Sequence, residues 1–250
     1  MKFLALAFAF LLLALPARAD DTEHFNRSLK LPAGGTLRLR GFAGHVTITA
    51  SDGDEVSVDA VRHGSRAWLD RTKLEMYAQG STVVVRDDES VHTSWFDWSP
   101  HHSIGETDFD IKVPKHINLD VNVFSSPVDV RGVEGTHKIH TFSAKIHLED
   151  AVGSIDAHTF SGGVDIQTKA WQDRQAIDVH TFSGSVELRI PESARGSVSF
   201  NSFSGRMTSD VPLTLHTSSR RSLDATLGGG DSSNGHVQVK TFSGNVHINK

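Results

Sequence analysis

The feature that most constrains this fold is a short repeat in the second half of the chain. A Phe-Ser-small triplet recurs six times, and the steps between successive Phe residues are 18, 18, 22, 21 and 39 residues. Self-similarity at a short period is typical of repeat architectures, in which each unit stacks on its neighbours. The triplets are Phe124-Ser125-Ser126, Phe142-Ser143-Ala144, Phe160-Ser161-Gly162, Phe182-Ser183-Gly184, Phe203-Ser204-Gly205 and Phe242-Ser243-Gly244.

Most triplets lie between two segments in which apolar and polar residues alternate. In the third copy, Ile155 and Ala157 alternate with polar residues before the triplet, and Val164 and Ile166 do so after it. A period of two indicates β-strands with one buried face. Two such strands and two turns account for about 20 residues. We therefore predict an all-β fold, a β-solenoid (β-helix-like) of stacked two-strand repeats. The alternative is an antiparallel sandwich, but here the residues recur by position, as stacking requires.

The N-terminal part is also rich in predicted strands and continuous with the stack. Alternation predicts strands over residues 36–40, 46–49, 55–61, 73–78 and 82–86, and a weak helical pattern covers 66–76. Gly41-Phe42-Ala43-Gly44 is similar to a worn copy of the repeat. We expect one β domain over residues 20–250, with irregular strands over 20–115, a loop over 87–108 and the repeats over 116–250. Between residues 207 and 236, the run Gly228-Gly229-Gly230 predicts a loop bulging from the stack.

Residues 1–19 have the features of a secretory signal peptide. Lys2 precedes an apolar run over residues 3–15, and Ala17-Arg18-Ala19 is a small-x-small cleavage site. We expect cleavage after Ala19 and export to the periplasm or the extracellular space. The apolar run is too short to span a bilayer and no second one is long enough, so no transmembrane segment is expected.

The overall charge and the absence of cysteine exclude several classes of protein. The formal net charge is −5 and there is no basic block, which argues against a nucleic-acid partner. The chain contains no cysteine, which excludes a disulfide framework and a thiolate metal site.

The repeat resembles that of a family of secreted bacterial β-strand-repeat proteins, known as adhesin-like and as a domain of unknown function. The resemblance rests on the Thr-x-Ser-Gly-x-Val unit, here Thr159-Phe160-Ser161-Gly162-Gly163-Val164, and on the lead-in Asp110-Ile111-Lys112-Val113-Pro114. It covers the chain from about Leu37 to the end. The resemblance implies a β-solenoid-like fold and a location in the cell envelope, and it brings no catalytic residues.

Strand parity before each triplet predicts two rows of side chains on one outer face. Each Phe shares its face with the residue two positions earlier, which is His in three successive copies. Large apolar rows rarely face water, so we expect the Phe rings to be covered, at a corner of the coil or beneath the N-terminal strands. Phe142, Phe160 and Phe182 are candidate partner-binding residues.

The histidine row suggests a metal site as one alternative. Neutral imidazoles of His140, His158 and His180 on adjacent repeats could bind zinc or copper, with Asp156 or Asp178 in supporting contacts. The other interpretation is a solvated polar row. The chain has no H-x-x-x-H or HExxH spacing, so we favour the solvated row and expect no cofactor.

The loop over residues 87–108 contains a cluster of aromatic residues and histidines that occurs once in the chain. It could form a lip that binds a sugar or a peptide, or it could cap one end of the stack. We favour the cap and keep its residues as partner-binding candidates: Trp95, Phe96, Trp98, His101 and His102.

These observations predict a non-catalytic cell-envelope protein with a binding, scaffolding or adhesin-like role. Taken one at a time, a histidine and a serine three residues apart suggest a base and a nucleophile, as in His140/Ser143, His158/Ser161 and His180/Ser183. Because the pair recurs in successive repeats, we interpret these residues as parts of the turn. The partner is expected to be an envelope protein or a glycan. The last copy, residues 241–248, predicts an open strand edge for self-association. A periplasmic zinc- or copper-binding protein and a carbohydrate-active enzyme are the alternatives.

Overall fold

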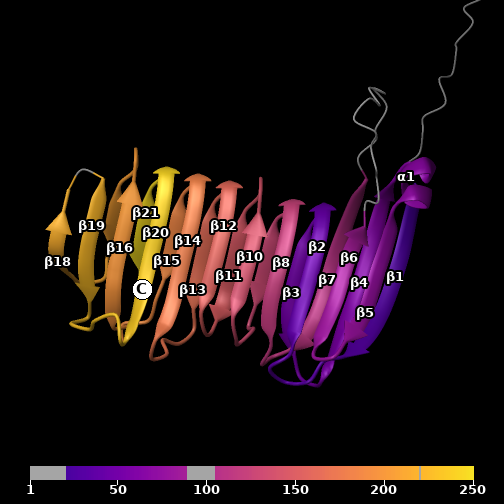
Figure 1. Cartoon of the computed structure of the whole chain (residues 1–250), viewed down its shortest axis with the longest axis horizontal. Helices are drawn as coiled ribbons and strands as arrows, with labels where there is room; N and C mark the ends of the chain where they lie inside the picture. Colours follow the sequence, from indigo (N-terminus) through magenta and orange to yellow (C-terminus); the bar gives the residue numbers. More distant parts are fainter. Residues whose placement is uncertain (1–20, 89–104, 220) are drawn as a thin grey trace, which may run out of the picture.

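The computed structural model describes residues 21–88, 105–219 and 221–250, which form two long β-sheets that face each other (Figure 1). In spatial order, sheet A contains β1 (Asp21–Lys30), β4 (Glu55–Gly64), β7 (Glu106–Pro114), β3 (Val46–Ser51), β9 (Val128–Arg131), β11 (Ile146–Ala151), β13 (Val164–Thr168), β15 (Val186–Arg189), β21 (Val246–Asn249) and β17 (Met207–Ser209). Sheet B contains β18 (Leu213–Ser218), β19 (Ser222–Leu227), β16 (Gly196–Ser202), β20 (Gly235–Ser243), β14 (Gln175–Ser183), β12 (Ile155–Ser161), β10 (His137–Thr141), β8 (Asn118–Ser125), β2 (Thr36–Ala43), β6 (Thr82–Asp88) and β5 (Lys73–Gln79).

Each repeat is one rung of the stack, with its first strand in sheet B and its second in sheet A. The rungs are β2–β3, β8–β9, β10–β11, β12–β13, β14–β15, β20–β21 and β16–β17. Neighbouring rungs pair in parallel and in register, so that Thr141 lies beside Thr159 and Thr159 beside Thr181. This is the β-solenoid-like stack that the repeat predicts, with the triplet at the corner where the chain passes between the sheets.

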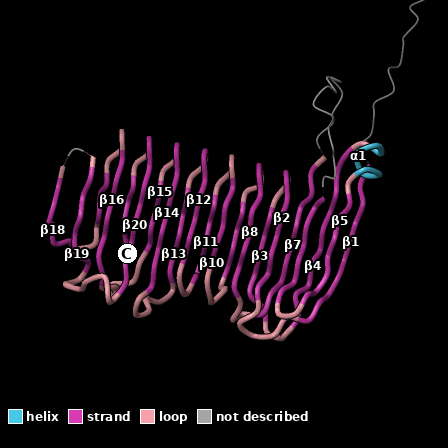
Figure 2. Tube along the Cα trace, viewed as in Figure 1, coloured by secondary structure: helices cyan, strands magenta, loops and turns pink. Residues whose placement is uncertain are grey.

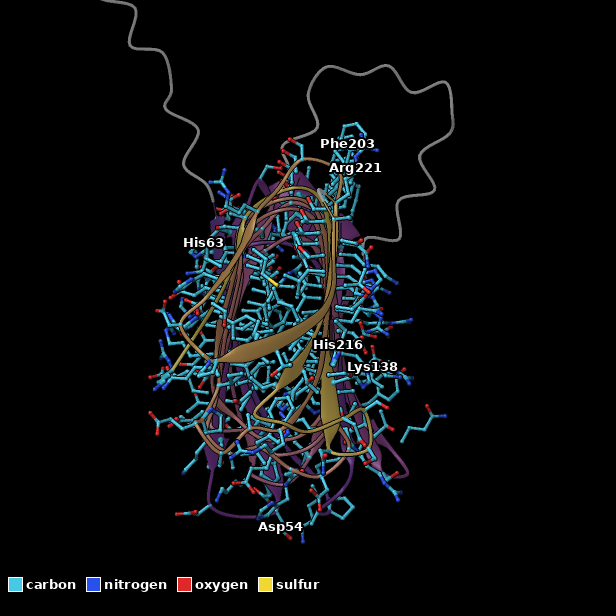
Figure 3. The ribbon with its side chains drawn as sticks, turned by 90° about the vertical axis from the view of Figure 1, so that its left-hand side faces the viewer. Asp54, His63, Lys138, Phe203, His216 and Arg221 are labelled. Atoms are coloured by element: carbon cyan, nitrogen blue, oxygen red, sulfur yellow. The ribbon has the colours of Figure 1, made fainter. Side chains whose placement is uncertain are left out.

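The core fills the space between the two sheets (Figure 3). Alternate residues of each strand point inward, and nearly all are apolar and fully buried. In the β12–β13 rung these are Ile155 and Ala157 from one sheet and Val164 and Ile166 from the other. The prediction of which residues in each strand face the core is therefore confirmed.

The last rung in the sequence is not the last rung in space. β20 pairs with β14 on one side and β16 on the other, and β21 likewise lies between β15 and β17. The C-terminus consequently lies within the stack, which Figure 1 shows where the yellow strands interrupt the orange ones. The open edge expected at residues 241–248 is therefore wrong, because both strands of that rung are paired on both sides.

Antiparallel strands lie at both ends of sheet B and at the β1 end of sheet A, whereas the other end of sheet A is the parallel strand β17. At one end β4 pairs with β1 and β7, and β5 pairs with β6; at the other end β19 pairs with β16 and β18. A loop was expected over residues 207–236, but most of this segment is strand, because Leu223, Ala225 and Leu227 alternate and supply an apolar face. The strand β1 was not predicted, since its residues are mostly exposed and do not alternate.

The helical pattern over 66–76 is confirmed only for one short helix. Helix α1 (Arg66–Arg71) lies at the β1 end of the stack (Figure 2), and Ser65 accepts a hydrogen bond from the Trp68 amide as its N-cap. In the part of the chain that the structure describes, no helix combines the length and apolarity needed to cross a membrane.

Candidate binding surface

Seven Phe rings form one continuous stack along the corner of the solenoid. Their centroids are 4.6–5.0 Å apart and successive ring planes lie within 5° of parallel. This spacing matches the distance between hydrogen-bonded strands, because each rung contributes one ring. We call this stack the Phe ladder. Its members in spatial order are Phe42, Phe124, Phe142, Phe160, Phe182, Phe242 and Phe203.

The Phe ladder is exposed, which corrects the expectation that the rings would be covered. Phe160 retains 47% of its accessible surface and Phe203 retains 54%, and the other exposed members retain 44–46%. The N-terminal strands do not cover the ladder, because β2 joins the stack as a further rung and adds Phe42 to it. Each ring covers the faces of its neighbours and leaves its edge to solvent, so stacking accounts for most of the burial that the rings do have.

Backbone packing at the corner fixes the position of the rings. In the turn after each Phe, the residue two positions later approaches the neighbouring rung closely. A Cβ on Gly184 would collide with the carbonyl oxygen of Gly162, and one on Gly162 would collide with that of Ala144. Phe142 and Ser143 both donate backbone hydrogen bonds to the Phe124 carbonyl. Rungs therefore pack at backbone contact here, which holds consecutive rings at stacking distance.

A groove of about 710 Å³ lies beside the Phe ladder on sheet B. One wall consists of the rings from Phe160 to Phe203, and the floor consists of the residues two positions before each ring. These floor residues are His140, His158, His180, Lys240 and Asn201. The groove therefore joins the two rows that the sequence predicts on one face.

The groove is positively charged at one end. Arg221 lies over the ring of Phe203, 4.4 Å from its centroid, and the two side chains extend together from the top of the stack in Figure 3. Lys240 lies one rung further along the floor. None of the described residues that line the groove is acidic. Arg221 was not predicted as a site residue from the sequence. It directly precedes β19, and only the antiparallel pairing of β19 with β16 brings it beside Phe203.

The histidines of the floor stack on one another. The ring centroids of His140 and His158 are 4.6 Å apart, and those of His158 and His180 are 4.5 Å apart. Burial lowers the pKa of His140 and of His180 below the ordinary value, and the neighbouring His158 lowers both further. The three predicted histidines are therefore brought together, with half-exposed rings.

The other predicted residues cannot be placed. The insertion candidates Trp95, Phe96, Trp98, His101 and His102 lie outside the described residues, as does the expected signal peptide over residues 1–19.

One titratable group inside the core was also missed. His137 occupies the position where the adjacent rungs have Leu119 and Ile155, and it is fully buried. Burial lowers its pKa to about 4. Parity alone would have placed it in the core, since it lies five residues before Phe142.

Comparison with known proteins identifies a family and a similar fold. The sequence profile of the Toastrack DUF4097 family matches residues 118–249, which contain six of the seven rings. A "putative cell adhesion protein" from Clostridium sporogenes ATCC 15579 is similar in structure, with a TM-score of 0.52 at 10% identity over 92% of this chain and 99% of that chain. At this identity the likeness shows a shared fold alone.

Two more distant structures have TM-scores of 0.32. One is a "putative adhesin" from Bacteroides fragilis NCTC 9343, 11% identical over 90% of this chain and 97% of that chain. The other is a "putative lipid binding protein" from Parabacteroides distasonis ATCC 8503, 12% identical over 91% of this chain and 96% of that chain. A search of curated proteins finds no match. Because the family profile covers more than half of the sequence, the chain belongs to the Toastrack DUF4097 family.

Proposed function

We propose that this protein is exported to the cell envelope and acts there by binding a protein partner along the Phe ladder. The observation that carries the proposal is the exposure of the ladder itself. Six of its rings each keep 44–54% of their surface accessible and form one contiguous apolar strip. Soluble proteins rarely leave such a strip uncovered unless it contacts a partner. The shallow groove beside it extends this surface on the same face.

The orientation of the rings favours a polypeptide over a glycan. Sugars pack against the flat faces of aromatic rings, whereas here the faces are used by ring-on-ring stacking at 4.6–5.0 Å. Phe203 ends the stack, and Arg221 covers its free face. The accessible surface consists of ring edges, against which aliphatic and aromatic side chains of a protein pack well. The partner segment is therefore apolar along the ladder.

The charge of the groove adds a second requirement for the partner. Arg221 and Lys240 lie near each other at one end, and the described lining contains no carboxylate to neutralise them. Opposite charges across an interface increase the association rate and fix the register of binding. A segment with apolar side chains followed by an acidic residue matches this surface, and the acidic residue lies at the Arg221 end.

The same surface argues for binding without catalysis. A catalytic site requires one preorganised set of groups, whereas the His–Ser spacing recurs in three successive rungs. The backbones of Ser143 and Ser161 form rung-to-rung hydrogen bonds at the corner. These serines have a structural role in the turn.

The test is a selection of peptides from a displayed random library on the immobilised, untagged protein, followed by fluorescence anisotropy on individual peptides. We expect acidic, apolar peptides with micromolar dissociation constants. Changing Phe160→Ser together with Phe182→Ser should weaken them at least about tenfold, since central aromatic residues dominate such interfaces. Arg221→Gln should weaken the acidic peptides and reduce their salt dependence.

The matched control is Gln167→Ser on β13, which lies on the outer face of sheet A in the same rung as Phe160. It should leave the affinity unchanged. The proposal is overturned if no selected peptide depends on Phe160 and Phe182. It is also overturned if defined oligosaccharides or phospholipid vesicles bind through these two residues while no peptide does, which would assign the surface to a glycan or a lipid.

A further inference from the structure

Three potential metal ligands converge on the outer face of sheet B. His140 on β10 and His158 on β12 are register partners, and Asp156 precedes His158 by two residues on the same face. His158 Nε2 lies 2.8 Å from Asp156 Oδ1, and His140 Nε2 lies 3.9 Å from Asp156 Oδ2. Each residue offers one ligand atom within 4.8 Å of the other two. Among the described residues, this is the cluster of histidines and acids whose spacing suits one ion.

The charge around Asp156 distinguishes it from a similar carboxylate on the opposite sheet. Asp165 also lies beside a histidine, His147, but it is neutralised by Arg189 at 3.1 Å and by Lys145 at 3.6 Å. Asp156 pairs only with its two histidines among the described side chains. No Lys or Arg side chain lies within ion-pair distance of Asp156 in the described structure, so the carboxylate has no permanently charged partner, and a bound cation would supply one.

The nearest lysine does not take that role. Lys138 lies beside Asp156 in the strand register but forms no ion pair with it within 4.0 Å in the described structure. Its side chain extends outward into solvent (Figure 3).

The donor set suits a borderline divalent transition ion. Two imidazole nitrogens and one carboxylate oxygen are typical ligands of zinc, and a three-ligand site leaves a position for water or a partner group. Zinc bonds of about 2.0–2.2 Å require donor atoms roughly 3.4 Å apart. The three ligand atoms lie within 4.8 Å of one another, so a tilt of the histidine rings must close their separations by about 1.4 Å at most. The three side chains are 37–43% exposed, which allows this tilt and allows the ion to enter.

We propose that His140 Nε2, the Asp156 carboxylate and His158 Nε2 bind one divalent transition ion of the zinc class. His180 is not a ligand, although its ring stacks on His158 at 4.5 Å. This assignment differs from a ladder of three histidines, because the carboxylate binds the ion directly and the site spans only two rungs. His140 and His158 also line the groove, so an ion bound by them would lie beside whatever occupies the groove.

The test is calorimetric titration of untagged, chelator-treated protein with Zn²⁺ in a buffer that does not bind metal. One ion per chain with a low-micromolar or tighter dissociation constant is expected. His140→Gln, Asp156→Asn and His158→Gln should each weaken binding at least about tenfold, since each removes one of three ligands. Two matched controls, His180→Gln in the same row and His147→Gln beside Asp165, should change it less than about threefold.

A second measurement needs no variant. In NMR spectra of the wild-type protein, Zn²⁺ should shift the imidazole signals of His140 and His158 and leave those of His147 in place. The proposal is overturned by the absence of stoichiometric binding, by equal weakening in the His180→Gln control, or by uniform shifts of all histidines. None of these results involves the Phe ladder, so the outcome is independent of the proposed protein partner.

Discussion

Phe182 and Phe242 stack with ring centroids 4.6 Å apart and planes within 4° of parallel, although five strands separate β14 from β20 in the sequence. This contact places the last repeat of the chain between two earlier ones. Phe242 also stacks on Phe203 at 4.8 Å, so the C-terminal rung supplies the ring that makes the ladder continuous. The ladder is thus a property of the assembled stack and not of consecutive repeats.

Deleting residues 246–250 should destabilise the protein as severely as losing an interior strand. β21 pairs with β15 and β17, so its removal exposes two strand edges and opens one side of the core over Val246 and Ile248. We expect aggregation at micromolar concentration, measured by light scattering. Deleting Lys250 alone, whose ammonium reaches only the exposed Glu192, is the control and should leave the unfolding midpoint unchanged. Equal behaviour of the two deletions would contradict the inserted rung.

Gly184→Ala should lower the free energy of unfolding by roughly 2–4 kcal/mol, because the added Cβ collides with the Gly162 carbonyl oxygen in the neighbouring rung. The two nearest atoms belong to the Gly162 backbone, which cannot move away as a flexible side chain could. Gly163→Ala is the matched control, since its Cβ would lie 3.6 Å from the nearest atom, the Ser185 carbonyl oxygen. Urea unfolding of both variants checks this. An unchanged free energy of unfolding in Gly184→Ala would show that the rungs do not pack at backbone contact at this corner.

Phe160→Thr should cost more stability than Phe203→Thr. Phe160 stacks on both Phe142 and Phe182, whereas Phe203 stacks on Phe242 alone and contacts Arg221 on its other face. Stacked aromatic pairs contribute about 0.5–1.5 kcal/mol each, so we expect a loss of roughly 1–3 kcal/mol for Phe160→Thr. Chemical denaturation at pH 7 measures the difference. An equal loss at both positions would mean that ring stacking contributes little.

Stability should fall as the pH drops from about 6.5 toward 4, in part through His137. Its folded pKa of about 4 lies below the unfolded value of about 6.5, so the unfolded state binds the proton first. The stabilisation that neutral His137 contributes is complete above the pKa of the unfolded state. It is lost as the pH falls toward the pKa of the folded state, and the total loss is roughly 3 kcal/mol. The lowered pKa values of His140 and His180 act in the same direction.

His137→Leu isolates this contribution, because adjacent rungs already accept Leu119 and Ile155 at the same register. At about pH 5 the variant should have a higher free energy of unfolding than the wild type. This difference should be roughly 2 kcal/mol larger at pH 5 than at pH 7.5. Urea denaturation at the two pH values provides the comparison. A pH dependence identical to that of the wild type would show that His137 takes up its proton without unfolding.

The local structure was predictable from the sequence because it depends on period and parity. Alternation located the strands of each rung, and the position of Thr159 relative to Phe160 identified which face is buried. The rows of Phe and His followed from the same parity. The spatial order of the rungs did not follow, because the repeats are nearly equivalent as stacking partners and only the connection through β18 and β19 places β20 before β16.

The exposure of the Phe ladder was the main error at the candidate site. Large apolar rows rarely face water, which predicts that a row of Phe will be covered. At a spacing of 4.6–5.0 Å the rings cover one another, so each loses about half of its accessible surface without a second layer.

Asp156 was expected only to support the histidines, because its distance to His158 depends on side-chain positions that the sequence does not specify.

The interior position of the C-terminal rung also determines when the molecule can finish folding. A solenoid whose rungs follow chain order can add each rung as it is synthesised. Here β16 can pair only with the antiparallel β19, and β17 has no partner strand, until residues 235–249 are available to form β20 and β21. The two halves of the stack therefore join in a single late closing step. Once β20 and β21 are in place, each is paired on both sides and joins the strands that precede and follow it in the stack.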